Sequence, residues 1–274
     1  MKELDRQAGV VLDALDAAGL ADRTLVIFTT DHGVALARHK HTLYDGGLRT
    51  ALLLRLPGVI PGGSTYGQLL SNVDLFPTVC ELTGVPVPDD LDGASFAGLF
   101  RGEDAAVRRS VFASVNWSRR SGQLCYTPHR CLRTDRYKLI RNDTPEPFYL
   151  DGGFVGRHVP DLGVLSDWPL FGNPSLQYEL YDCVADAWEQ HNLSDDPVHA
   201  DRLGRIKEAL AGMMRETGDP LAHGTVPNQT GEPVKPQWLS NEAGEYRLNY
   251  DLETETKERP FAIRRVSSPG KEMR

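Results

Sequence analysis

The sequence is poor in the features that would indicate a disulfide scaffold, a membrane span or a nucleic-acid surface. It has only 4 Cys in 274 residues and no Cys-x-x-Cys pair, so it predicts neither a zinc site nor a disulfide framework. Its longest apolar runs, such as residues 25–28 and 51–54, are far too short to cross a bilayer. No basic segment and apolar core of a secretory signal follow Met1. Acidic side chains outnumber basic ones by 38 to 30, which argues against nonspecific binding to nucleic acid.

The remaining composition is that of an ordinary globular protein, with 40% hydrophobic and 25% charged residues, 26 Gly and 18 Pro. The length suits one large domain or two smaller ones. Residues 223–274 are polar and contain equal numbers of basic and acidic side chains, so the net charge of −8 lies on residues 1–222. We expect this last stretch to be an extended arm or a partly disordered tail.

The first hundred residues alternate between helix and strand patterns. Apolar residues at helical spacing predict an opening helix that ends at Gly19. The β-prone runs 24–30 and 51–56 are typical of parallel strands covered on both faces. Residues 75–83 predict a short helix with Asp74 as its N-cap. Two strands are too few to complete such a sheet, so we expect this region to be the later part of a larger α/β domain.

The pattern changes after about residue 105. Antiparallel strands are predicted at residues 111–116, 130–133, 136–140 and 178–182. Residues 145–174 predict a long loop, and a helix follows from its N-cap Asp196. The expected fold class is therefore α/β. An incomplete parallel or mixed sheet occupies residues 1–105, a small antiparallel sheet with a C-terminal helix occupies residues 106–222, and residues 223–274 form the tail.

The first candidate ligand-binding residues are Asp31-His32-Gly33, directly after the first predicted strand. Loops at the carboxyl ends of strands are where open α/β sheets bind ligands. Asp31 offers a hard oxygen and His32 an imidazole nitrogen, although a capped turn is the plainer interpretation of these residues alone. Downstream, Lys40 stands between two histidines, which suits an oxyanion such as sulfate or phosphate. A solvated surface lysine is the alternative.

Other polar and cysteine residues carry weaker signals. A basic cluster lies on the predicted hairpin at Arg130, Arg133, Arg136 and Lys138. It could meet an anionic sugar chain, but a solvated strand face is the favoured interpretation. Three isolated histidines are expected on the surface or in loops, at His129, His158 and His191. Cys80, on the apolar side of a predicted helix, is expected in the core.

Several motif-like segments run in order along residues 1–220. They are Phe28-Thr-Thr-Asp-His-Gly33, Lys40-His-Thr-Leu-Tyr-Asp-Gly-Gly47, Asn72-Val-Asp-Leu-Phe-Pro-Thr78, Arg130-Cys-Leu-Arg-Thr-Asp-Arg-Tyr-Lys-Leu-Ile140 and Glu179-Leu-Tyr-Asp182. Together they resemble the sulfatase family within the alkaline-phosphatase superfamily. The resemblance implies that superfamily's fold and hydrolysis of a sulfuric ester or sulfamate on a sulfated sugar or glycan. Thr50-Ala51 is slightly similar to the branch that acts on N-sulfoglucosamine.

The resemblance also implies roles for individual residues. Asp31 and His32 match ligands of a divalent metal, usually calcium in this family. Lys40 matches a lysine that contacts the sulfate and neutralises charge on the departing oxygen, and His41 beside it is a second candidate for binding substrate. Calcium prefers all-oxygen shells and His32 offers nitrogen, so manganese is an alternative.

The family's nucleophile is not in this sequence. It is a formylglycine made from the Cys or Ser of a C/S-x-P-x-R motif, and the similar segment Cys125-Tyr-Thr-Pro-His-Arg130 has Pro and Arg one place too far along. The family's Asp-Asp metal pair is missing as well. We expect both in a missing amino-terminal part or in an oligomeric partner. We therefore predict that this chain alone neither hydrolyses sulfate esters nor binds calcium tightly.

Two other functions stay open. The first is a phosphoryl or phosphonyl ester hydrolase of the same superfamily, which the nucleophile would distinguish. The second is a noncatalytic remnant that acts as an interaction module, against which the exposed edges of an unfinished sheet argue. We expect no nucleic-acid partner and no membrane partner, and the sequence leaves the cellular location open.

Overall fold

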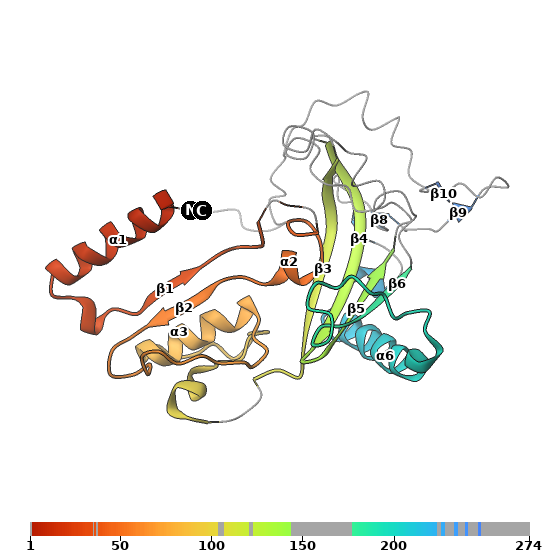
Figure 1. Cartoon of the computed structure of the whole chain (residues 1–274). Helices are drawn as coiled ribbons and strands as arrows, with labels where there is room; N and C mark the ends of the chain where they lie inside the picture. Colours follow the sequence, from red (N-terminus) through yellow and green to blue (C-terminus); the bar gives the residue numbers. More distant parts are fainter. Residues whose placement is uncertain are drawn as a thin grey trace, which may run out of the picture.

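A four-stranded antiparallel sheet forms the centre of this computed structural model (Figure 1). Its strands, in spatial order, are β3 (Ser110–Arg120), β4 (Gln123–Thr134), β5 (Tyr137–Asn142) and β6 (Tyr178–Asp182). The structure describes residues 2–34, 36, 38–103, 107–120, 123–143, 177–223, 226–227, 233–234, 239–240 and 246–247.

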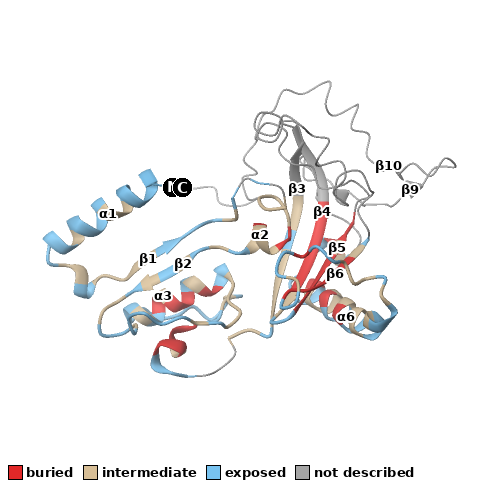
Figure 2. Cartoon of the chain, in the orientation of Figure 1, coloured by how far each residue is buried: buried red, intermediate tan, exposed pale blue. Residues whose placement is uncertain are grey.

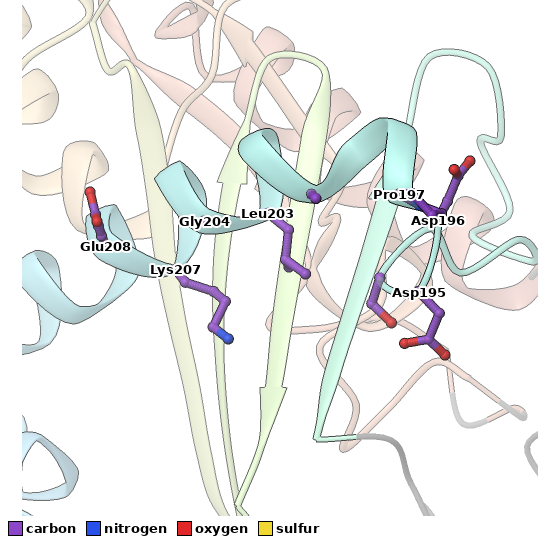
Figure 3. A pocket seen from close by; sticks show the side chains of 9 residues that line it. Asp195, Asp196, Pro197, Leu203, Gly204, Lys207 and Glu208 are labelled. Atoms are coloured by element: carbon purple, nitrogen blue, oxygen red, sulfur yellow. The ribbon is translucent and has the colours of Figure 1, made fainter.

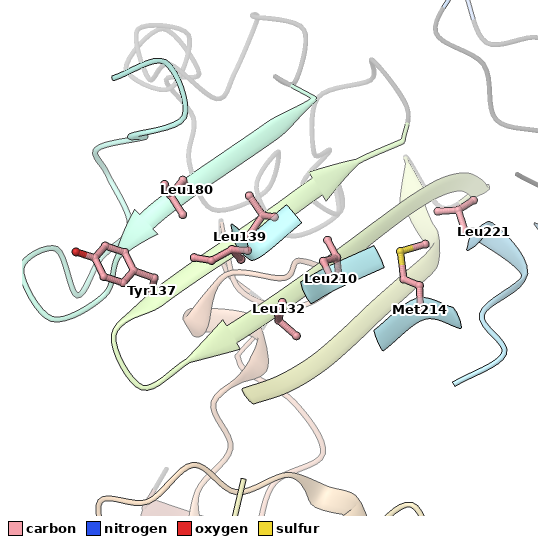
Figure 4. Packing of buried hydrophobic residues seen from close by; sticks show 8 residues of the cluster. Leu132, Tyr137, Leu139, Leu180, Leu210, Met214 and Leu221 are labelled. Carbon is pink, nitrogen blue, oxygen red and sulfur yellow. The ribbon is translucent and has the colours of Figure 1, made fainter. Parts of the chain in front are cut away.

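Helix α6 (Ala200–Glu216) covers one face of this sheet. The contact is a cluster of buried apolar side chains from β4, β5, β6, α6 and the turn after it: Leu132, Tyr137, Leu139, Leu180, Ile206, Leu210, Met214 and Leu221 (Figure 4). Asp196 caps the helical segment as predicted, because its carboxylate accepts the Val198 N–H at 2.9 Å. One 3-10 turn, η4 (Pro197–His199), precedes α6.

The amino-terminal part contains short elements joined by long loops. They are α1 (Lys2–Ala17), η1 (Ala21–Arg23), β1 (Val26–Thr29), α2 (Asp45–Leu48), β2 (Leu52–Arg55), η2 (Asn72–Asp74), α3 (Leu75–Thr83) and η3 (Ala97–Arg101). After α6 come η5 (Pro220–His223) and two strand pairs, β7 (Val226–Pro227) with β8 (Pro233–Val234) and β9 (Leu239–Ser240) with β10 (Tyr246–Arg247).

The parallel pairing expected for the first two strands is wrong. β1 and β2 are antiparallel, with Val26 opposite Arg55 and Thr29 opposite Leu52, in a two-stranded sheet. A continuous apolar run indicates which faces a strand can bury, but it carries no information about the direction of its neighbour. Nor are both faces covered by the described residues, since Leu53 is 63% exposed.

The opening helix lies where it was predicted: it ends at Ala17, and Gly19 just beyond it has the left-handed φ of 63°. None of its side chains is buried by the described residues, and apolar Leu4 and Val11 are exposed (Figure 2). The amphipathic pattern therefore predicted the helix correctly, while its apolar stripe has no cover within the described part of the chain.

Asp74 occupies the predicted N-cap position of α3, but its side chain does not cap that helix. Its buried carboxylate accepts the N–H groups of Ser71 and Ala94, each at 2.8 Å, and pairs with Arg108. Ser71, not Asp74, is the side-chain cap, through a capping box at η2. Asp74 thus connects the start of α3 to the loop before η3 and to the segment leading into β3.

The later elements lie where they were predicted, although β3 (Ser110–Arg120) and β4 (Gln123–Thr134) are longer than the predicted strands 111–116 and 130–133. β6 has the predicted bounds, and the β4–β5 turn falls at Asp135-Arg136, one residue later than expected. The predicted loop 145–174 lies outside the described residues, as does most of the tail 223–274. The domain boundaries therefore stay predictions. Among the described residues, no helix has the length and apolar character needed to span a bilayer.

The packing of α6 on the sheet predicts a large effect of Leu210→Ala. Leu210 is 1% exposed in the cluster of Figure 4, so its truncation should lower the free energy of unfolding by about 3 kcal/mol in urea titrations. Leu53→Ala, at a position 63% exposed, is the control and should cost less than about 0.5 kcal/mol. Equal losses in the two variants would contradict this account of the core.

Candidate active site

The described residues between 31 and 48, which are 31–34, 36 and 38–48, form one folded loop between β1 and β2. The Gly33 N–H donates to the carbonyl of Gly47 at 3.0 Å, and the Lys40 N–H donates to the carbonyl of Val34 at 3.1 Å. These two backbone hydrogen bonds bring Asp31-His32 and Lys40, which the sequence predicted as site residues, into the same loop. Lys40 and His41 are half-buried, whereas Asp31 is exposed.

Asp31 and His32 place two potential metal ligands side by side. His32 Nδ1 lies 2.8 Å from the Gly33 carbonyl, and Nε2 lies 3.1 Å from Asp31 Oδ2. Because a carbonyl only accepts, Nδ1 is the donor in the first contact, and Nε2 faces the Asp31 carboxylate. The Asp31 carboxylate also accepts the His32 N–H at 3.0 Å, as in the plainer capped turn.

This donor pair fits a hard divalent cation only in part. One carboxylate and one imidazole are fewer than the six to eight ligands that calcium takes. The described residues contain no group of three or more His, Cys, Asp or Glu side chains able to hold a metal ion. Any metal at Asp31 and His32 would need ligands beyond those that the described part of the chain brings there.

The loop is packed so tightly that two positions require glycine. A Cβ on Gly33 would lie 1.7 Å from the carbonyl oxygen of Gly46. A Cβ on Gly47 would lie 2.4 Å from the carbonyl oxygen of His39 and 2.5 Å from that of Thr42. Such distances are far inside van der Waals contact, so the backbone of this loop closes on itself only with bare Cα atoms at these positions.

Residues 43–48 of the loop cover the second face of the central sheet, which is largely buried and carries both polar and apolar side chains. Alternate residues of its strands point to this face: His129, Cys131 and Arg133 on β4, Lys138, Ile140 and Asn142 on β5, and Glu179 and Tyr181 on β6. Leu43 and Tyr44 of the loop, both 2% exposed, pack against Cys131, Ile140 and Tyr181. The sheet is therefore enclosed between α6 and the candidate-site loop.

A buried ion cluster joins the loop to this face. Lys138, whose side chain is fully buried, pairs with Asp45 of the loop and, at 2.5 Å, with Glu189 Oε1. The Asp45 N–H donates to Glu189 Oε2 at 2.6 Å, and Arg133 Nε lies 3.6 Å from Asp45 Oδ1. Burial alone would lower the pKa of Lys138, but nearby acidic groups, including Glu189 and Asp45, raise it. The cluster balances two cations with two carboxylates.

A second buried network centres on Glu179. Its Oε2 accepts the hydroxyls of Tyr44 at 2.7 Å and Tyr181 at 2.5 Å, and its Oε1 accepts the Asn142 amide at 2.7 Å. His129 Nδ1 lies 2.8 Å from Asn142 Oδ1 and extends the chain of hydrogen bonds across β4 and β5. The loop is thus held to the sheet at two successive residues, Tyr44 and Asp45.

The predicted solvated strand face is wrong for Arg130 and Lys138. Arg130 is 1% exposed and pairs with Asp219 on the α6 side, while Lys138 is buried on the loop side. His129 is likewise buried and not a surface residue. The expectation holds for Arg136, whose side chain is 56% exposed beside Asp182. The sequence pattern of alternating polar residues is the same whether the strand face is exposed to solvent or covered by a distant loop.

Comparison with known proteins decides the family. The sequence profile described as "N-sulphoglucosamine sulphohydrolase, C-terminal" matches residues 33–149. An ulvan-active sulfatase of Formosa agariphila is 32% identical over 235 residues, which are 85% of this chain and 45% of the relative. The chain belongs to the sulfatase family. It spans less than half the length of this sulfatase.

Solved structures confirm the expected alkaline-phosphatase-like fold class. A protein in complex with its substrate D-glucosamine-2-N,6-O-disulfate has a TM-score of 0.60 at 24% identity, over 78% of this chain and 39% of that chain. A phosphonate monoester hydrolase of Agrobacterium radiobacter has a TM-score of 0.57 at 24% identity, over 86% of this chain and 44% of that chain. At this identity these likenesses concern the fold.

The described cysteines of this sulfatase-family chain are not placed as nucleophiles. Cys80, Cys131 and Cys183 are all buried, and the first belongs to the core as predicted. Burial raises the pKa of Cys131 to about 12 and that of Cys183 to about 11, so neither thiol ionises near neutral pH. The described thiols therefore offer no alternative to the nucleophile that the family makes from its own motif.

A pocket of about 440 Å³ lies at the start of α6, away from the predicted site residues. It is lined by Ser194, Asp195, Asp196, Pro197, Ala200, Leu203, Gly204, Lys207 and Glu208 (Figure 3). Its carboxylates outnumber its one lysine, so its charge does not suit a sulfated ligand. The buried Glu189 and Lys138, together with the half-buried Asp45 of the loop, form a group that the sequence did not predict.

The tight packing of the loop predicts that Gly47→Ala is destabilising. The added methyl group would overlap two carbonyl oxygens, and the resulting displacement should cost about 2 kcal/mol in urea unfolding. Gly62→Ala is the matched control, because a Cβ there meets nothing within 4 Å. Equal unfolding midpoints for the two variants would show that the loop does not pack in this way.

Burial of His129 predicts a specific acid sensitivity. Desolvation lowers the pKa of His129 to about 4, below its usual value near 6.5. The unfolded chain therefore binds a proton below pH 6.5 that the folded protein does not bind until about pH 4. This contribution to stability is present above pH 6.5 and is lost as the pH falls toward 4, by an amount on the order of 3 kcal/mol.

We expect His129→Gln to flatten the pH dependence of unfolding free energy between pH 6.5 and 4, measured by denaturant titration at each pH. His191→Gln is the control, because the His191 side chain is 82% exposed. An unchanged slope in His129→Gln would mean that His129 is not held neutral in the folded protein.

Proposed function

We propose that this chain provides one side of the active site of a sulfatase that hydrolyses sulfuric esters, or sulfamates, of sugars. The observation that carries the proposal is the folded loop 31–48, in which two backbone hydrogen bonds bring Asp31-His32 and Lys40 together. Most of this loop lies within the residues that match the sulfatase-family profile.

Each residue of the loop has a role in this proposal. Lys40 contacts the sulfate and stabilises negative charge on the departing oxygen. His41, the next residue, is a second substrate contact. Asp31 and His32 are two ligands of a divalent metal, calcium or alternatively manganese. When bound, such a metal would polarise the sulfuryl group as a Lewis acid.

The nucleophile in this proposal is a formylglycine from polypeptide outside these 274 residues. Support comes from the absence of a C/S-x-P-x-R motif in the sequence and from the incomplete donor set at Asp31 and His32. The same polypeptide would supply the remaining metal ligands. The exposed apolar side chains of α1, including Leu4 and Val11, are a surface on which it could pack.

A sulfated carbohydrate is the proposed substrate class. The similar protein from F. agariphila is named an ulvan-active sulfatase, and a protein of the same fold was solved with a disulfated glucosamine as its substrate. The fold likeness to a phosphonate monoester hydrolase supports the second candidate, hydrolysis of phosphoryl or phosphonyl esters. The two functions differ in the ester that the complete enzyme turns over, and Lys40 would serve an oxyanion in either.

Titration of the chain with inorganic sulfate tests the role of Lys40. Backbone amide resonances of the loop should shift, with a dissociation constant of about millimolar because only one side of the site is present. Lys40→Ala should weaken this binding about ten-fold or more, since it removes a charged hydrogen-bond donor. Lys207→Ala, beside Tyr178 at the α6 pocket, is the control and should change nothing. Equal affinities of the wild-type chain and Lys40→Ala would contradict the proposal.

A further inference from the structure

We propose that Glu189 is a positioning residue that clamps both ends of the segment carrying Lys40 and His41. Glu189 follows β6 and lies in sequence more than 140 residues after that segment. Its effect on catalysis rests on the function proposed above for Lys40. Its contacts with the segment do not depend on that function.

Glu189 makes three contacts with the loop and the central sheet, two of which reach the loop directly. Its backbone carbonyl accepts a hydrogen bond from the Arg38 guanidinium, and its Oε2 accepts the Asp45 N–H at 2.6 Å. Arg38 and Asp45 stand on either side of Lys40 and His41. The third contact, from Oε1 to the Lys138 ammonium at 2.5 Å, fixes the carboxylate on the sheet. Glu189 is 2% exposed, so water does not compete for these groups.

The clamped segment has a backbone that needs such support. Among the described residues, the non-glycine positions with positive φ are Arg38 at 60°, His41 at 68° and Glu189 at 55°. Two of them flank Lys40, and the third makes the contacts described above. Non-glycine residues keep this left-handed conformation only where surrounding contacts hold it. The residues with positive φ and the contacts that hold them thus lie together around Lys40.

Arg38 contributes a further contact on the same side. Its guanidinium carbon lies 3.8 Å from the centre of the Tyr44 ring, so the side chain that reaches Glu189 also packs on the loop. Tyr44 in turn donates to Glu179. Loss of the Glu189 side chain would remove the acceptor of the Asp45 N–H, while Tyr44 stays bonded to Glu179 and the Asp45 carboxylate keeps Lys138. The expected change is therefore local.

Trypsin cleavage after Arg38 and Lys40 measures the clamp on the full chain. Cleavage there requires the segment to leave its folded conformation, so its rate reports local opening. We expect Glu189→Leu to raise the initial rate of cleavage after Lys40 at least ten-fold, as quantified by mass spectrometry of the peptides. Glu189→Gln, which keeps an oxygen for the Asp45 N–H but loses the charge facing Lys138, should restore most of the protection.

Asp219→Asn is the matched control. It removes the buried carboxylate partner of Arg130 on the opposite face of the sheet, far from the loop contacts. Each variant is assayed at the same interval below its own melting temperature, so that global destabilisation is matched. Cleavage after Lys40 should then be unchanged in Asp219→Asn.

Three results would overturn the proposal: wild-type cleavage after Lys40 as fast as in Glu189→Leu, equal acceleration in Asp219→Asn, or no recovery in Glu189→Gln. If Glu189→Leu does not fold, Glu189→Gln should still show faster cleavage than Asp219→Asn.

Sulfate titration of the same proteins separates the clamp by Glu189 from the function proposed for Lys40. A clamp detected by trypsin without any sulfate binding would leave Glu189 as the support of the loop and would remove the function assigned to Lys40.

Discussion

The buried pairing of Lys138 with Asp45 and Glu189 is the interaction on which the arrangement of the site depends. A charged group taken out of water is stable only beside an opposite charge, and removing one partner from such a pair typically costs 3–5 kcal/mol. Lys138 belongs to the central sheet, Asp45 to the candidate-site loop and Glu189 to the segment after β6. Each is satisfied only when all three segments are in place, so folding of the sheet and placement of the loop are coupled.

Because of this coupling, the small sheet supports the candidate-site loop as well as α6. One face packs on α6 through aliphatic side chains, and the other carries polar groups that are complete only when residues 43–48 cover them. Structurally, the loop that carries Lys40 belongs to the core of the sheet as much as to β1 and β2. The sheet thereby acts as a rigid base for the loop, and rigid support is what a group needs to meet a developing charge without reorganisation.

Local patterns in the sequence predicted much of this structure. β6 and α3 have the predicted bounds, and the cap at Asp196 is where Pro197 and the following apolar stripe indicated it. The family motifs singled out the loop containing Lys40, whose role in a site stays a prediction. These features depend on neighbouring residues, and neighbouring residues are what periodicity, capping and motif arguments use.

The remainder depends on contacts between distant residues. Asp45 and Glu189 are 144 positions apart, and nothing around Glu189 in the sequence distinguishes it from a surface acid. Lys138 was assigned to a wet face because alternation of polar and apolar residues shows only that a strand has two different faces. The antiparallel pairing of β1 with β2 was missed because a continuous apolar run carries no information about the direction of the neighbouring strand. What covers a face, and which way a neighbour runs, is decided by tertiary structure.

The most direct test of the account is turnover of an aryl sulfate by this chain alone and by the same chain combined with a sulfatase polypeptide that carries the C/S-x-P-x-R motif in its formylglycine form. The account predicts no turnover by the chain alone, and turnover by the combination that is lost in Lys40→Ala. An aryl phosphonate assayed in parallel should react more slowly. Turnover by the chain alone, or turnover by the combination that does not need Lys40, would contradict the claim that this loop is one side of a sulfatase site.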